Sequence, residues 1–365
     1  MVTVPLSVGL GTSIGTLPHV DPDHAVRFVL ARQPRLPAVP SLPNWSLLER
    51  RVPQAAWGVD GVSVMPDGSL SLDHRRLTPG SPVTDPQFGG EPFVSLRAFV
   101  AALAGREGPA KFQLTGPVTL GVALHAAGVE PTAAFRLAAS VVTDRARNLI
   151  AYIHDHAPGV QPVVFVDEPS LQAVADPDFP LGTEAAVDLV SGVLATLEPH
   201  AVTGLRCGGR ADWHLVLEAG PQILAVPASE DLVSQAGALD RFLDRGGWVA
   251  WAAVTTEGPI GSGVDRLWRH LSGLWCQLVR TGVDPVRLRT QALITPIGGP
   301  GRGHARARRP AGEAPLRPGH GAPSQRRGLT GRGRCPRLPP NGASPRGGAG
   351  GARTVPPTRG AWWGG

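Results

Sequence analysis

The fold is decided by stretches such as VVFVDEPSL, residues 163–171, in which a short apolar run ends abruptly in two acidic residues. Its first four residues are all apolar, a pattern typical of a strand buried on both faces of a sheet. Seven further runs are short, β-rich and mostly bounded by Gly, Pro or Asp: residues 8–12, 38–42, 111–115, 203–207, 223–226, 249–254 and 293–295. We therefore expect eight strands.

Amphipathic segments that predict helices separate these runs. The clearest are residues 21–33, 131–156, 182–198, 229–246 and 263–282, which repeat apolar residues at helical spacing. Eight strands with helical crossovers favour an α/β fold of the (β/α)8 barrel type. A doubly wound open sheet is the alternative, although no glycine-rich phosphate loop follows the first strand. Residues 62–73, with Asp-Gly between two alternating runs, predict an inserted β-hairpin.

The chain changes character after the eighth expected strand. Residues 301–365 hold 13 Arg, no Lys and a single acidic residue, Glu313, so residues 1–300 carry a net charge of −6. A segment this rich in Gly, Pro and Arg cannot bury enough apolar surface to order itself. We expect a barrel over residues 1–297 and a disordered basic tail over residues 298–365, in place of the eighth helix.

Two origins of the tail remain open. Arg/Gly-rich segments can bind RNA. A GC-rich gene read out of frame yields the same residues, and the Arg-rich body with its single lysine, Lys111, fits such a genome. The second origin is favoured, and the coding DNA near codon 297 would decide it.

Composition also limits where in the cell the protein is expected and which classes of partner it can have. Residues 1–15 lack the basic stretch and apolar core of a secretory signal, and no apolar run is long enough to span a bilayer. The three cysteines, Cys207, Cys276 and Cys335, are far apart and odd in number, which argues against a disulfide framework. We expect a cytoplasmic protein without a membrane partner, and a nucleic-acid partner only through the tail.

Chemistry in a (β/α)8 barrel is located at the carboxyl ends of the strands. Four strand ends stand out: GTSIGTLPH at residues 11–19, the adjacent Asp167 and Glu168, LRCGG at residues 205–209, and ALITPIGG at residues 292–299. Asp167 could be a functional carboxylate or, with about equal weight, an ordinary helix cap or loop residue. Glu168 could equally be solvated or cap a helix, and His214 is expected on the surface.

Five stretches, taken together in this order and spacing, resemble a known family. They are GTSIGTLPHVDPDHAV (11–26), KFQLTGPVTL (111–120), VVFVDEPSL (163–171), RCGGRADWHLVLEAGPQIL (206–224) and ALITP (292–296). They resemble the C-terminal catalytic barrel of cobalamin-independent methionine synthase, in the short stand-alone form found within the uroporphyrinogen decarboxylase/methionine synthase-like superfamily. The resemblance covers about residues 8–297.

The resemblance implies a methyltransferase of methionine biosynthesis, which moves a methyl group to the thiol of homocysteine. The donor would be a methylfolate or a methylated corrinoid protein. The implied cofactor is zinc, which binds a substrate sulfur as the reactive thiolate. By the same resemblance, Ile14, Gly15 and Thr16 form a substrate-binding turn, while Asp167 and Glu49 hold the amino acid, with Asp167 also catalytic.

The metal positions depart from the family pattern. Where relatives carry a His and a Cys at the sixth strand end, this chain has Arg206 and Gly208, with Cys207 between them, and Gly298 occupies a later Cys position. A one-residue shift would make Cys207 the ligand and put Leu205 at the His position. The next strand end offers no carboxylate ligand unless Glu230 turns toward it. One thiolate cannot hold catalytic zinc, and a guanidinium repels it.

We therefore expect a methionine synthase-type methyltransferase that is impaired and has lost its zinc. Two alternatives stay open: a non-catalytic barrel that binds an amino acid, and the product of a decayed gene with an RNA-binding-like tail.

Overall fold

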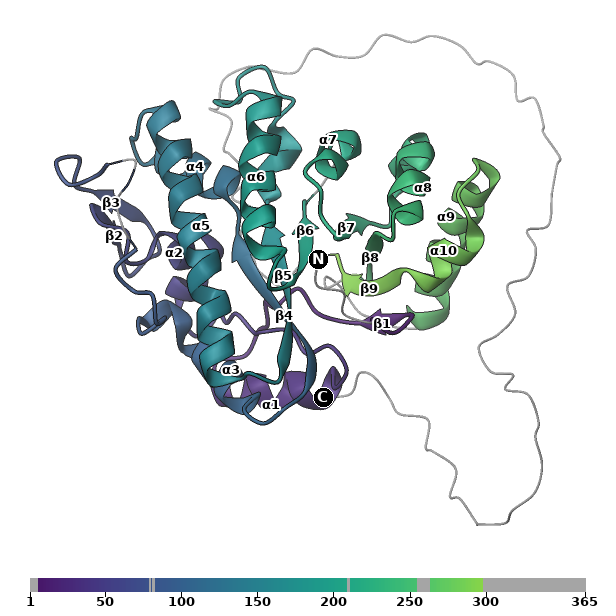
Figure 1. Cartoon of the computed structure of the whole chain (residues 1–365), viewed down its shortest axis with the longest axis horizontal. Coiled ribbons are helices and arrows are strands. Elements are labelled where there is room, and N and C mark those ends of the chain that lie inside the picture. The colour runs from purple at the N-terminus through teal and green to yellow at the C-terminus, as the bar shows by residue number, and fades with distance from the viewer. Residues whose placement is uncertain (1–5, 79, 81–82, 209–210, 255–262, 298–365) are drawn as a thin grey trace, which may run out of the picture. The chain divides into compact units, whose positions relative to one another are not determined.

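Seven parallel strands form one sheet in the order β1-β9-β8-β7-β6-β5-β4 (Figure 1). The computed structural model describes residues 6–78, 80, 83–208, 211–254 and 263–297. The strands are β1 (Leu10–Gly11), β4 (Gly108–Thr115), β5 (Val160–Asp167), β6 (Val202–Arg206), β7 (Ile223–Pro227), β8 (Trp248–Val254) and β9 (Ala292–Pro296). Each contains or overlaps one of the runs expected from the sequence.

The remaining expected run, residues 38–42, is found as residues 37–41, here called the closing strand, which joins the two edges of this sheet. On one side Val39 N donates to Lys111 O (2.9 Å) and Lys111 N donates to Pro37 O (2.8 Å). On the other side Ser41 N donates to Gly15 O (2.9 Å) and Leu17 N donates to Ser41 O (3.0 Å). Both pairings are parallel, so these four bonds close the sheet into the expected (β/α)8 ring.

Helices connect the strands and cover the outer face of the sheet (Figure 1). The longer ones are α1 (Pro22–Arg32), α3 (Val94–Ala102), α4 (Pro117–Ala126), α5 (Pro131–His156), α6 (Thr183–Leu197), α8 (Ala236–Asp244) and α9 (Gly263–Arg280); α2 (Arg51–Ala56), α7 (Trp213–Glu218) and α10 (Pro285–Thr290) are short. Single-turn helices are η1 (Leu47–Glu49), η2 (Glu91–Phe93), η3 (Pro169–Ala173) and η4 (Glu230–Gln235). The predicted hairpin is present as β2 (Val62–Val64) and β3 (Leu70–Leu72), paired antiparallel.

Two apolar clusters lie on the two faces of the sheet. The smaller cluster is inside the ring and includes Leu10, Val163, Phe165, Val202 and Leu293. The larger one packs the outer face of the strands against the helices and includes Leu205 and Cys207. Because side chains alternate along a strand, neighbouring residues face different surroundings, and this alternation positions the site described below.

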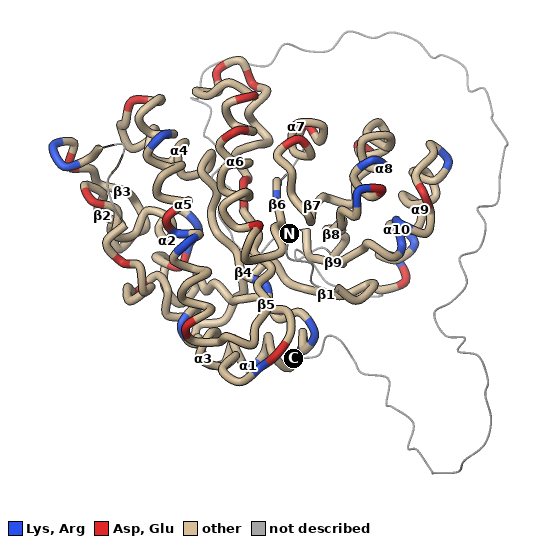
Figure 2. Tube along the Cα trace, viewed as in Figure 1, with Lys and Arg blue, Asp and Glu red and all other residues tan. Residues whose placement is uncertain are grey.

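Charged residues are concentrated on the helices and loops, and few lie on the strands (Figure 2). None of the described helices combines the length and apolar character needed to cross a membrane. The predicted tail, residues 298–365, lies outside the described residues, as does Gly298.

Candidate functional site

Asp167 ends strand β5 on the inner face of the ring, where it is 4% exposed. Its neighbours in register are Thr115 on β4 and Arg206 on β6. Its Oδ2 atom lies 3.5 Å from Arg206 Nη1 and 3.8 Å from Arg51 Nε. Its Oδ1 atom is buried and has no hydrogen-bond partner among the described residues. Buried polar atoms are rarely left unpaired in native proteins, so Oδ1 is an acceptor still lacking a partner within the described part of the chain.

Lys111 adds a third cation below this carboxylate. It pairs in register with Val163 of the inner cluster, and its ammonium nitrogen lies 4.6 Å from the centre of the Phe165 ring. The pKa of Lys111 is lowered to about 8, mainly by burial; the charge of Asp167 raises it and the charge of Arg206 lowers it. Three basic side chains therefore surround one carboxylate, which makes this end of the ring electropositive and suited to an anionic group.

Glu168 follows Asp167 in the chain and has a different environment. Its carboxylate accepts hydrogen bonds from Val118 N (2.7 Å), Thr119 N (2.8 Å) and Thr119 Oγ1 (2.6 Å) at the start of α4. The pKa of Glu168 is raised to about 7, because the effect of burial exceeds the opposing effect of these hydrogen bonds. Glu168 thus caps a helix from a neighbouring strand end, which is one of the two interpretations that its sequence position left open.

Cys207 lies on the outer face of the sheet. Its side chain is 3% exposed and belongs to the outer apolar cluster. Burial raises the pKa of the Cys207 thiol to about 12, and the Glu168 carboxylate raises it as well. A thiol with such a pKa stays protonated near neutral pH, whereas nucleophiles and metal ligands require the thiolate. The residue before it, Arg206, faces the ring interior instead.

The predicted turn is separated from β4 by the closing strand. Ile14 and Gly15 are buried, and Thr16 pairs with Ser41 of the closing strand. Gly15 has a φ of +93°, and a Cβ atom there would lie 2.0 Å from Gln113 Nε2. No other residue fits so close to the Gln113 amide, which itself donates to Val39 O (3.0 Å).

Glu49 is fully buried and bonded to backbone. Its Oε2 accepts from Leu42 N (2.7 Å), and its Oε1 accepts from Ser95 N (2.9 Å). Burial raises the pKa of Glu49, and the hydrogen bonds from Ser95 and Leu42 act against this. The carboxylate fixes the loop after the closing strand to α3. Because both of its oxygens accept from backbone amides, Glu49 is not a second unpaired acceptor beside Asp167.

The residues at the expected metal positions do not fit a zinc ion. Arg206 supplies a cation, Gly208 has no side chain, and Gly298 is outside the described residues. Glu230 is exposed, and its Oε1 accepts from Gln277 Nε2 (3.4 Å). Within the described part of the chain, no three His, Cys, Asp or Glu side chains are grouped as metal ligands would be.

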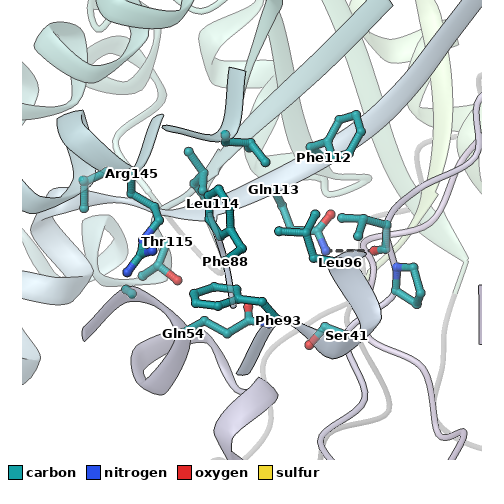
Figure 3. Close-up of a pocket in the computed structure, with 15 residues that line it drawn as sticks. Ser41, Gln54, Phe88, Phe93, Leu96, Phe112, Gln113, Leu114, Thr115 and Arg145 are labelled. Carbon is teal, nitrogen blue, oxygen red and sulfur yellow. Dashed lines mark hydrogen bonds between the residues drawn. The ribbon is translucent and has the colours of Figure 1, made fainter. Parts of the chain in front are cut away.

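A cavity of about 50 Å³ opens between the closing strand and β4 (Figure 3). Its polar edge includes Ser41, Gln113 and Thr115, which belong to these two strands. Its apolar wall comes from the helix layer and from the outer side of β4, and includes Phe88, Phe93, Leu96, Phe112 and Leu149. Thr115 is the register partner of Asp167, but Asp167 does not line the cavity, and most of the apolar wall belongs to the outer cluster.

Arg145 of α5 lies at the far end of this cavity from Gln113 (Figure 3). It is 3% exposed, and its guanidinium donates to the backbone oxygens of Trp57 and Asp85. It also stacks on Phe88 and Phe93, with its Cζ atom 5.3 Å and 4.9 Å from the ring centres. These contacts tie the loop after the hairpin to α5.

Comparison with known proteins leaves the chain without an assigned family. No protein-family profile matches the sequence, and no curated protein matches it. Among solved structures, a similar one is described as the "Putative Vitamin-B12 Independent Methionine Synthase from Listeria monocytogenes". The two sequences are 14% identical, the match covers 76% of this chain and 80% of that chain, and the TM-score is 0.47. At this level, the similarity does not transfer function or site residues.

The sequence analysis missed the basic partners of Asp167 and the side chains beside it. In KFQLT, residues 111–115, polar residues alternate with Phe112 and Leu114, which face the outer cluster. This alternation predicts that the Lys111, Gln113 and Thr115 side chains face the interior of the ring. Arg51 gave no such signal, because it reaches Asp167 only through the folded loop after the closing strand.

Proposed function

We propose that this chain is a methionine synthase-like barrel that binds a small α-amino acid at the carboxyl ends of its strands, without activating a thiol through zinc. The observation that carries the proposal is the Asp167 carboxylate, with one oxygen paired to two guanidinium groups and the other buried without a partner among the described residues. An α-amino acid carries one cation and one anion on the same carbon, and this arrangement offers a partner for each.

The ligand's ammonium group would donate to Asp167 Oδ1, and its carboxylate would pair with Arg206 and Arg51. A planar guanidinium suits a carboxylate because it can donate two parallel hydrogen bonds. Lys111 contributes positive potential from below. The turn at Ile14, Gly15 and Thr16 borders the same opening through Ser41 and Gln113, and Glu49 supports it by holding the adjacent loop.

Methyl transfer to homocysteine is the activity implied by the resemblance, with a methylfolate or a methylated corrinoid protein as donor. Zinc would supply thiolate activation in such a reaction. Because Arg206 and Gly208 stand at the ligand positions, we propose that this step is impaired and that the retained function is binding.

Isothermal titration calorimetry with homocysteine and methionine tests the proposal, together with elemental analysis for zinc on the same purified protein. We expect binding without zinc, weakened roughly 30-fold or more by Asp167→Asn, since losing one partner of a buried charge pair typically costs about 2–5 kcal/mol. Asp155→Asn is the matched control, because the Asp155 side chain is 61% exposed on α5. Stoichiometric zinc with methyl transfer to homocysteine, or unchanged binding by Asp167→Asn, would contradict the proposal.

A further inference from the structure

Three of the nine tryptophans form a stack that leads from strand β8 to the exposed side of α9. We infer that Trp251, Trp275 and Trp268 form a relay for single-electron oxidation, in which an electron lost from either buried ring is replaced by one from Trp268. Oxidative modification of this part of the molecule therefore collects at the surface and spares the packing between β8 and α9. The inference does not depend on amino-acid binding at Asp167.

The stack runs outward through the layer between the sheet and the helices. Trp251 on β8 is fully buried, Trp275 on α9 is 6% exposed, and Trp268, earlier on the same helix, is 50% exposed. The ring centres of Trp251 and Trp275 lie 5.9 Å apart, and those of Trp275 and Trp268 lie 5.8 Å apart, both in T-shaped arrangements. Such separations are those of aromatic rings in contact. The three π systems therefore adjoin one another, and an electron can pass from ring to ring.

The indole N–H groups determine which ring keeps the oxidation. Loss of one electron turns indole into a radical cation, which is a much stronger acid than neutral indole. The Nε1 atoms of Trp251 and Trp275 are buried and have no hydrogen-bond partner among the described residues. A radical cation at either ring therefore has no acceptor for its proton there and keeps its charge in apolar surroundings, which is unfavourable. Trp268 is half-exposed, so water takes its proton and a neutral radical remains.

Oxidation through the stack changes covalent bonds only at Trp268. Ultraviolet ionisation of a ring ejects one electron, and an added cobalt(III) ammine complex takes up this electron as it becomes cobalt(II). A radical cation formed at Trp251 or Trp275 regains an electron from its neighbour, and Trp268 supplies the last one. Trp268 then releases its N–H proton to water, and the neutral radical adds dissolved dioxygen. One C–O bond forms at a ring carbon of Trp268, and the unpaired electron moves to the outer oxygen.

Ultraviolet irradiation of the full-length protein in aerated buffer with hexaamminecobalt(III), followed by tryptic peptide mass spectrometry, tests the relay. Cleavage after Arg269 separates the peptide of Trp268 from that of Trp275. The reference is Trp45, which is 36% exposed and lies outside the stack. Loss of unmodified Trp268 should exceed loss of unmodified Trp45 about threefold, because three rings pass their oxidation to Trp268. Trp251 and Trp275 should stay largely unmodified.

Replacement of single rings by phenylalanine separates the relay from simple exposure of Trp268. Trp275→Phe keeps an aromatic ring at the middle position, but this ring is harder to oxidise, so the ratio of Trp268 loss to Trp45 loss should fall to about one. Trp251→Phe removes only the innermost donor, and the ratio should fall to about two. Trp248→Phe is the matched control, because Trp248 lies on the same strand and packs against the inner cluster; it should leave the ratio unchanged.

Circular dichroism and thermal melting establish that each variant is folded, and Trp251→Phe supplies the comparison if Trp275→Phe does not fold. The wild-type protein alone can also overturn the inference: Trp251 and Trp275 modified as much as Trp268 would mean that oxidation stays where it is formed. An unchanged ratio in a folded Trp275→Phe or Trp251→Phe variant would mean that the modification of Trp268 reflects its exposure and not its contact with the buried rings.

Discussion

Asp167 and Glu168 are consecutive acidic residues at one strand end, yet they lie on opposite faces of the sheet. Asp167 faces the ring interior beside Arg51 and Arg206, and one of its oxygens is buried without a hydrogen-bond partner among the described residues. Glu168 faces outward, and both of its oxygens accept hydrogen bonds at the start of α4. The same contrast separates Arg206 from Cys207 on the next strand. Alternation along a strand thus divides ligand-facing groups from groups that stabilise the fold.

The largest expected effect on stability comes from Glu168, on the outer face of the sheet. Glu168→Ala should lower the free energy of unfolding by about 3–4 kcal/mol, since it leaves the buried amides of Val118 and Thr119 without an acceptor. Chemical denaturation of the variant and wild type measures this. Amino-acid affinity should stay within about twofold of wild type, whereas Asp167→Asn weakens it. A folded Glu168→Ala variant that loses amino-acid binding would contradict the assignment of binding to the inner face and stabilisation to the outer face.

Glu168 should also make stability depend on pH. Its pKa is about 7 in the folded protein, against an ordinary value of 4.5, so the folded state holds the extra proton between these values. Its stabilising contribution is therefore complete below pH 4.5 and is lost as the pH rises through about 7, a change of about 3 kcal/mol. The difference between wild type and Glu168→Gln, measured by denaturation from pH 4.5 to 7.5, should show this slope; parallel curves would contradict it.

Lys111 should give a dependence of the opposite sign on the inner face. Its pKa falls from 10.5 to about 8 on folding, so the unfolded chain binds more protons between these values and stability rises with pH. Wild type should gain about 2–3 kcal/mol relative to Lys111→Met between pH 8 and 10.5. A constant difference across this range would mean that the ammonium is better solvated than its burial indicates.

The smallest effect is expected at Cys207. Cys207→Ala should destabilise the protein by only about 1 kcal/mol, as for the loss of one small buried apolar group. In the native protein at pH 8, iodoacetamide should leave Cys207 unmodified, because the thiol is buried and its pKa is about 12. Peptide mass spectrometry before and after denaturation measures this. Rapid alkylation of Cys207 in the native state would contradict its description as a buried, unreactive thiol.

Local sequence patterns predicted the strands and the hairpin because burial on both faces and the Asp-Gly turn leave local signals. Asp167 could be located at a strand end for the same reason. The partners of these residues could not be predicted, because they come from distant segments: Thr119 lies 49 residues from Glu168, and Arg145 Nη2 contacts the backbone of a residue 88 positions away. The cavity depends on Phe88 and Phe93, loop and single-turn residues without periodicity.

The closing strand has a mechanical consequence. Residues 37–41 are joined to their neighbours by only four backbone hydrogen bonds, and the Gln113 side chain takes the place of the next one. The other strand interfaces between β4 and β8 pair over three to eight residues. The β1–β9 interface is also short, with two paired residues. Thermal opening of the ring should therefore begin in the part of the sheet formed by β1 and the closing strand, and amide hydrogen exchange at Val39 and Ser41 should report it. Such an opening would admit solvent and small molecules to the wall of the barrel while the remaining strands stay paired.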